Sequence, residues 1–144
     1  MMDILLVQQR SAQQIRAFLA VMFHCPIERI KIFSLEEFNS LTEELDGLSF
    51  DCVCVFSPVR GDVAQLLQLY RYKISDSDAA KRFVDIALHN KVHCYLPSNS
   101  LGEWIYVGDG DNPERAQQIS CEEEDCFFFK LAEPSTKCNT DLLS

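Results

Sequence analysis

The N-terminal part of the chain alternates short apolar runs with amphipathic segments. Two capping boxes, Ser11 with Gln14 and Ser34 with Glu37, each begin a stretch whose apolar residues recur at helical spacing, and they predict two helices. Short runs rich in aliphatic and β-branched residues lie before, between and after these helices. They predict three strands, at Asp3–Gln8, Glu28–Phe33 and Phe50–Phe56.

The same alternation continues through the middle of the chain. Apolar residues at helical spacing predict a helix over Asp62–Tyr72 and a second helix over Ser77–Asn90. Val92–Leu96 is a fourth predicted strand, which ends at Pro97. Strands that alternate with helices favour right-handed crossovers between parallel strands. We therefore expect a three-layer α/β fold with a mainly parallel central sheet and helices on both faces.

The last third of the chain has a different pattern. Glu103–Val107 alternates polar and apolar residues, Gly108–Pro113 is dense in turn-forming residues, and Cys126–Leu131 is a strongly apolar run. We expect these two strands to pair antiparallel, as a C-terminal hairpin extension of the sheet. Residues 133–144 have no periodicity. The sequence thus predicts a single α/β domain over residues 1–132 and a mobile C-terminal tail over residues 133–144.

Length and composition bound the class of protein. With 144 residues, of which 47% are hydrophobic, the chain can bury a substantial core. Its apolar runs are far shorter than the roughly 20 residues that span a bilayer, and no signal-peptide pattern follows Met1. We expect a cytoplasmic protein with no membrane partner. The seven cysteines are odd in number and lack paired Cys-x2-Cys spacing, which favours reduced thiols and no metal site.

Negative charge is concentrated in one segment. Between Asp109 and Asp125 the chain has seven acidic residues and one basic residue, Arg115, so this segment supplies six of the nine net negative charges. An acidic surface repels phosphate and attracts partners rich in lysine and arginine. The pI of about 4.7 is the reverse of what a nucleic-acid-binding protein shows, so no nucleic-acid partner is expected.

We predict that the acidic segment binds a basic protein. Aromatic residues surrounded by charge are typical of interface hot spots, and two aromatic residues precede the segment. The predicted partner-binding residues are Trp104, Tyr106, Asp109, Asp111, Glu114, Glu122, Glu123, Glu124 and Asp125. The alternative interpretation of the run from Glu122 to Asp125 is a solvated loop that keeps the neighbouring phenylalanine-rich strand soluble.

The sequence contains no recognisable catalytic or cofactor-binding motif. It has five glycines, none of them in a phosphate-binding loop, so no nucleotide cofactor is expected. His93 and Cys94 are adjacent on a predicted strand and therefore face opposite sides, which keeps His93 from activating the thiol. We predict that the protein is not an enzyme. A nucleophile and base pair formed by Cys94 and His89 is the catalytic alternative.

The order of strands and helices in the first half resembles the start of a response-regulator receiver domain, with Phe50–Pro58 as its third strand. The resemblance implies an acidic pair after the first strand and a phosphate-accepting aspartate at the end of the third. Here Gln8 and Gln9 follow the first strand, and Phe56 and Ser57 end the third. One functional hypothesis is therefore a catalytically inert, receiver-like regulatory domain.

The favoured hypothesis is a small acidic protein-binding module. Its most specific version is a bacterial immunity protein that neutralises a basic toxin, for example a nuclease, by direct binding. Small size, strong acidity, cytoplasmic composition and the lack of catalytic motifs all fit this version. No motif assigns the chain to a named immunity family.

Overall fold

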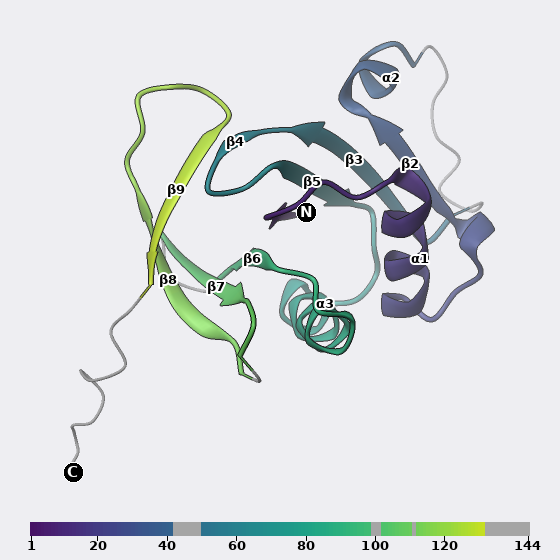
Figure 1. Ribbon diagram of the computed structural model, residues 1–144. Coiled ribbons are helices and arrows are strands. Elements are labelled where there is room, and N and C mark those ends of the chain that lie inside the picture. The colour runs from purple at the N-terminus through teal and green to yellow at the C-terminus, as the bar shows by residue number, and fades with distance from the viewer. Residues whose placement is uncertain (42–49, 99–101, 111, 132–144) are drawn as a thin grey trace.

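The computed structural model describes residues 1–41, 50–98, 102–110 and 112–131 (Figure 1). Its strands form one nine-stranded sheet in the order β2-β3-β5-β1-β6-β7-β8-β9-β4. The strands are β1 Met2–Leu6, β2 Ile30–Ser34, β3 Cys52–Pro58, β4 Arg60–Gly61, β5 Gln65–Tyr70, β6 Cys94–Pro97, β7 Glu103–Val107, β8 Glu114–Ile119 and β9 Cys126–Leu131. The helices are α1 Ala12–Met22, α2 Leu35–Asn39 and α3 Asp76–Asn90, with a 3-10 turn, η1, at Ile27–Arg29.

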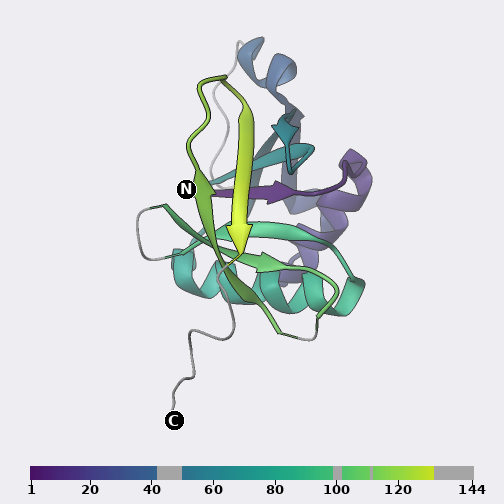
Figure 2. The same ribbon diagram turned by 60° about the vertical axis from the view of Figure 1, so that its left-hand side comes forward.

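Antiparallel pairing dominates this sheet. Among the described strands, β2 runs parallel to β3 and β4 runs parallel to β9, and the other neighbours are antiparallel. The predicted three-layer α/β fold with a mainly parallel sheet is therefore wrong. Helices α1 and α3 cover one face, and the strands from β7 to β9 curl over part of the other (Figures 1 and 2). The receiver-like hypothesis relied on a parallel sheet and loses that support.

One segment accounts for much of this difference. The helix predicted over Asp62–Tyr72 is instead strand β5, which lies antiparallel between β3 and β1. Gln65, Leu67 and Leu69 are buried and alternate with less buried residues, which is the period of a strand. The apolar residues of the segment also satisfy helical spacing. Because β5 is a strand, the chain reverses direction after β3 instead of crossing over to a parallel neighbour.

The C-terminal strands differ from the prediction in a second way. Strand β8 was not predicted, and it lies between β7 and β9. The two predicted strands therefore do not pair with each other, because each pairs antiparallel with β8. The predicted tail, residues 133–144, lies outside the described residues.

Both predicted capping boxes are present. The backbone N–H of Gln14 donates to Ser11 Oγ at 3.2 Å, and the Ser11 N–H donates to Gln14 Oε1 at 3.1 Å. Ser34 and Glu37 make the same reciprocal pair, at 3.1 and 2.8 Å. These bonds satisfy backbone donors that the first helical turn leaves without partners, so α1 and α2 begin where the sequence predicts.

Two cores lie on opposite faces of the sheet. The larger core, between the sheet and helices α1 and α3, contains fully buried side chains such as Ile4, Leu19 and Phe83. The smaller core lies on the opposite face, which β7, β8 and β9 curl over and which we call the inner face. It is rich in aromatic residues. There the ring of Tyr95 stacks on Phe129 with centroids 3.9 Å apart.

The short strand β4 ties the two ends of the sheet together. Val59 alone separates β3 from β4, yet β3 is second in the strand order and β4 is last. Gly61 makes this contact possible, because it has a φ of +98° and a Cβ there would lie 2.1 Å from the carbonyl oxygen of Phe127. Strand β9 is thereby held over the inner face, together with the turn that precedes it.

Candidate functional site

The acidic residues are divided between the two ends of β8. Asp109 lies in the turn before this strand, and Glu114 is its first residue. Glu122–Asp125 form the turn between β8 and β9, named here the acidic turn. At about 3.4 Å per residue, β8 places these two groups roughly 20 Å apart. Asp111 lies outside the described residues.

The acidic turn is anchored by Arg60 of β4. The guanidinium of Arg60 pairs with the Glu123 carboxylate at 2.9 Å and donates to the carbonyl of Glu124 at 3.2 Å. The backbone N–H of Arg60 donates to the carbonyl of Asp125 at 2.8 Å. Glu122 is also exposed, and no hydrogen bond or ion pair of its side chain occurs among the described contacts. The turn therefore presents carboxylates to solvent from a backbone that is already ordered.

An exposed apolar pair lies beside the acidic turn. Ile119 and Phe128 are direct cross-strand partners on β8 and β9, and they are 48% and 40% exposed. Alternation along β9 turns Phe127 and Phe129 toward the inner core and Phe128 toward solvent. This pair was not predicted from the sequence, although strand alternation within Cys126–Leu131 indicates that Phe128 faces away from Phe127 and Phe129.

The two predicted aromatic residues pack on the inner core. The indole N–H of Trp104 donates to Gln118 Oε1 at 3.0 Å, and its ring meets Phe129 edge-on with centroids 5.6 Å apart. Tyr106 packs against Tyr95 at 4.8 Å between centroids. Partial burial raises the pKa of the Tyr106 hydroxyl, and the negative charges of Asp109 and Glu114 raise it further. Both aromatic side chains are half-buried; Trp104 bonds near the end of β8 that leads into the acidic turn, whereas Tyr106 is opposite Glu114 at the start of β8.

The turn between β7 and β8 contains a separate polar contact. Asp109, whose side chain is 96% exposed, lies with one carboxylate oxygen 2.9 Å from Nε2 of His93. Lys91 and Gly108 lie against the same small hollow, whose volume is about 100 Å³. The contact is an ion pair only when His93 is protonated. The contact links Asp109, in the turn between β7 and β8, to the segment that joins α3 and β6.

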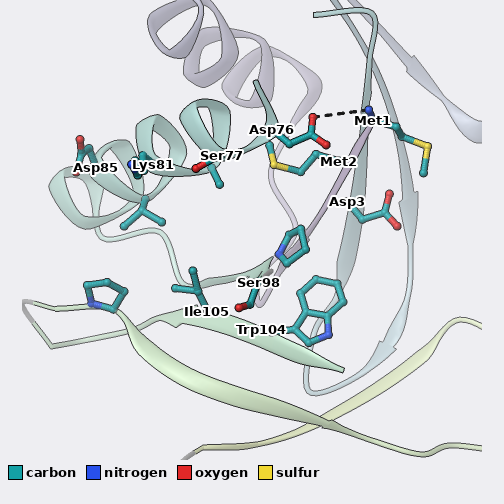
Figure 3. Close-up of a pocket in the computed structure, with 14 residues that line it drawn as sticks. Met1, Met2, Asp3, Asp76, Ser77, Lys81, Asp85, Ser98, Trp104 and Ile105 are labelled. Carbon is teal, nitrogen blue, oxygen red and sulfur yellow. Dashed lines mark ion pairs between the residues drawn. The ribbon is translucent and has the colours of Figure 1, made fainter. Parts of the chain in front are cut away.

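A groove of about 680 Å³ opens between α3 and the ends of β1, β6 and β7 (Figure 3). Asp76, Lys81 and Asp85 line it from α3, and Trp104 and Ile105 line it from β7. Strand β1 pairs with β6 at only two positions, so the two strands separate toward this groove. Trp104 therefore lines the same groove as residues of α3.

His89, the base of the catalytic alternative, is exposed in the last turn of α3, whereas the thiol of that alternative is buried. Cys94 is fully buried, and burial raises the pKa of its thiol to about 12, which disfavours the nucleophilic thiolate. Burial also raises the pKa of the Cys52 thiol to about 12. Across the described ranges, no group of three or more His, Cys, Asp or Glu side chains is arranged to hold a metal ion.

Comparison with known proteins identifies no relative. No family model matches the chain, and no match to a curated protein or to a solved structure is significant. In the part of the chain that the structure describes, none of the helices has the length and apolar character needed to cross a membrane.

Proposed function

We propose that this protein is a small acidic protein-binding module that binds a basic protein through its C-terminal hairpin, which consists of β8, the acidic turn and β9. The observation that carries the proposal is the ordered acidic turn beside the exposed pair Ile119 and Phe128. An apolar centre next to a charged rim is the usual anatomy of a protein interface. The acidic turn supplies the rim and the exposed pair supplies the centre.

The hydrogen bonds of Arg60 support this assignment. They order the acidic turn before any partner arrives, and this lowers the conformational entropy lost on binding. Rim carboxylates steer a cationic partner and set the association rate, whereas a desolvated aromatic side chain sets the dissociation rate. We assign these two roles to Glu122 with Glu124 and to Phe128.

The more specific form of the proposal is a bacterial immunity protein that neutralises a basic toxin, such as a nuclease, by covering its cationic active site. The net charge of −9 complements the basic surface by which a nuclease binds nucleic acid. Tyr106, Asp109 and Glu114 form a second part of the predicted surface at the other end of β8, and Trp104 lies between the two parts, opposite Ala116. A large partner would contact both ends, because they are roughly 20 Å apart.

Charge reversal tests the proposal. The partner is first sought by co-expression with the product of the neighbouring gene, and its binding kinetics are then measured at several salt concentrations. Glu122→Lys with Glu124→Lys should slow association about tenfold or more at low salt and flatten the salt dependence. This pair of changes leaves the ion pair between Arg60 and Glu123 intact.

The matched control is Glu28→Lys with Asp85→Lys, which changes the net charge equally at exposed positions on η1 and α3. It should slow association much less than the turn variant. Equal slowing by both variants would mean that overall charge, and not the acidic turn, attracts the partner. A partner that binds the turn variant at the wild-type rate would contradict the proposal.

A further inference from the structure

Two cysteines face each other at the base of the acidic turn. In the register of β8 and β9, Ala116 is opposite Leu131 and Ile119 is opposite Phe128. The paired register ends at Ile119 and Phe128, and extending it by two residues toward the acidic turn would place Cys121 opposite Cys126. Directly opposed residues of antiparallel strands have Cα atoms about 4.5 or 5.5 Å apart. Both distances lie within the roughly 4.4–6.8 Å that disulfides span.

Side-chain contacts agree with this register. The thiol of Cys126 hydrogen-bonds to the sulfur of Cys121, and desolvation together with this bond raises the pKa of Cys126. Both residues are half-buried, so a small oxidant in solvent reaches them. Cys52, Cys54 and Cys94 are instead fully buried. Access thus distinguishes the pair in the hairpin from Cys52, Cys54 and Cys94, and the hydrogen bond between the two sulfurs distinguishes it from the half-buried Cys25.

We propose that Cys121 and Cys126 are a reversible oxidation site, which forms a disulfide across the hairpin when it reacts with a low-molecular-weight disulfide such as oxidised glutathione. One thiolate attacks the oxidant, which forms a mixed disulfide and releases one glutathione thiolate. The second protein thiolate then attacks the mixed disulfide and releases the other glutathione. Two protein thiols are oxidised and one glutathione disulfide is reduced, and the two protons lost by the protein thiols are taken up by the two glutathione thiolates that leave.

The disulfide closes a ring around the four acidic residues of the turn. Arg60 already orders this turn from the β4 side, and the new bond would fix it from the β8 side as well. Because the ring is short, the gain in the free energy of unfolding is small. Any effect of the disulfide on the binding of a basic partner depends on the proposed function. Formation of the disulfide itself does not depend on it.

The test uses the full-length reduced protein in buffers that range from mostly reduced to mostly oxidised glutathione. Free thiols are then alkylated and the disulfides are mapped by peptide mass spectrometry. The expected result is one intramolecular disulfide, Cys121 to Cys126, which thioredoxin or dithiothreitol reverses. Cys121→Ser and Cys126→Ser should each abolish it. Cys25→Ser, a change at another half-buried cysteine, should leave it intact.

Three outcomes would overturn the proposal. They are glutathione adducts without a protein disulfide, a disulfide that uses a different pair of cysteines, and no oxidation before the protein unfolds. Mapping of the wild-type protein remains decisive even if a serine variant is unstable, because it requires no substitution. Failure to find a basic partner would leave this chemistry intact, and failure of the chemistry would leave the binding proposal intact.

Discussion

The two faces of the sheet are stabilised in different ways. The face under α1 and α3 is filled by a large cluster of aliphatic side chains and Phe83, most of them fully buried. The inner face under β7, β8 and β9 is filled by fewer side chains, which include five aromatic rings and several half-buried residues, and is closed by a strand of two residues. Since stabilisation grows with buried apolar area, the first face supplies most of the stability. The part of the molecule formed by β7, β8 and β9, called the hairpin half below, contributes less to stability. It can therefore expose charged and apolar side chains for binding.

Truncation of a core side chain should show the largest difference in stability between the helical half, under α1 and α3, and the hairpin half. Phe83→Ala removes a ring that is 1% exposed and should lower the free energy of unfolding by about 3–5 kcal/mol. Phe129→Ala removes a half-buried ring from the inner core and should cost clearly less. Chemical denaturation of both variants measures the difference. An equal or larger loss for Phe129→Ala would show that the hairpin half is as important to stability as the helical half.

Removing the connection through β4 should affect the hairpin half alone. Gly61→Ala introduces a Cβ against the Phe127 carbonyl at a φ of +98°, and strain of this kind costs about 1–3 kcal/mol. Gly102→Ala is the matched control, because Gly102 also has a positive φ of +79° but no neighbour within 4 Å of the added Cβ. Hydrogen exchange should show faster opening of β9 in the Gly61 variant only. Unchanged protection of β9 would contradict the role assigned to β4.

A pH titration should show a smaller effect on the helical side. Arg29 donates to Asp51 through Nε at 2.9 Å and Nη2 at 3.2 Å, and this hydrogen-bonded pairing lowers the pKa of the Asp51 carboxyl. A lowered carboxyl pKa in the folded state stabilises the protein above the unfolded-state pKa, and this contribution is lost as pH falls through the folded-state pKa. Asp51→Asn should therefore be less stable than the wild type at neutral pH, and the two stability curves should converge in acid. A difference that persists at low pH would refute the ion-pair explanation.

Local hydrogen bonding and strong periodicity made much of the secondary structure predictable. The capping boxes at Ser11 and Ser34 act within four residues, and α1 and α2 begin where they indicate. The predicted strands near β1, β2, β3, β6, β7 and β9 are present, as is the helix near α3. Each of these signals depends on residues close together in the sequence.

The sheet topology could not be predicted from the same signals. Val63, Leu66, Leu67 and Tyr70 are spaced i, i+3, i+4 and i+7, which fits a helix, whereas strand alternation divides them between two faces. Tertiary pairing therefore overrode the local pattern of this segment. Strand β8 is mostly polar, because Ala116 is its single buried residue and its outer face is uncovered. Contacts such as Arg60 with Asp125 join residues far apart in the chain, and no local pattern encodes them.

The candidate site was predictable in part. The sequence located the acidic residues, and all those within the described ranges are exposed. Their division into two groups followed from β8, which was not predicted. The exposed ring of Phe128 followed from strand alternation, which was visible in the sequence but was not applied to this residue.

Hydrogen exchange of the full-length protein with and without its purified partner tests the central claim most directly. If the hairpin is the binding surface, the partner should slow exchange of the amides from Ile119 to Phe128 and leave α1 and α3 unchanged. Protection confined to Ala12–Met22 or Asp76–Asn90, with no change across the acidic turn, would contradict the claim and would place the interface on the helical face.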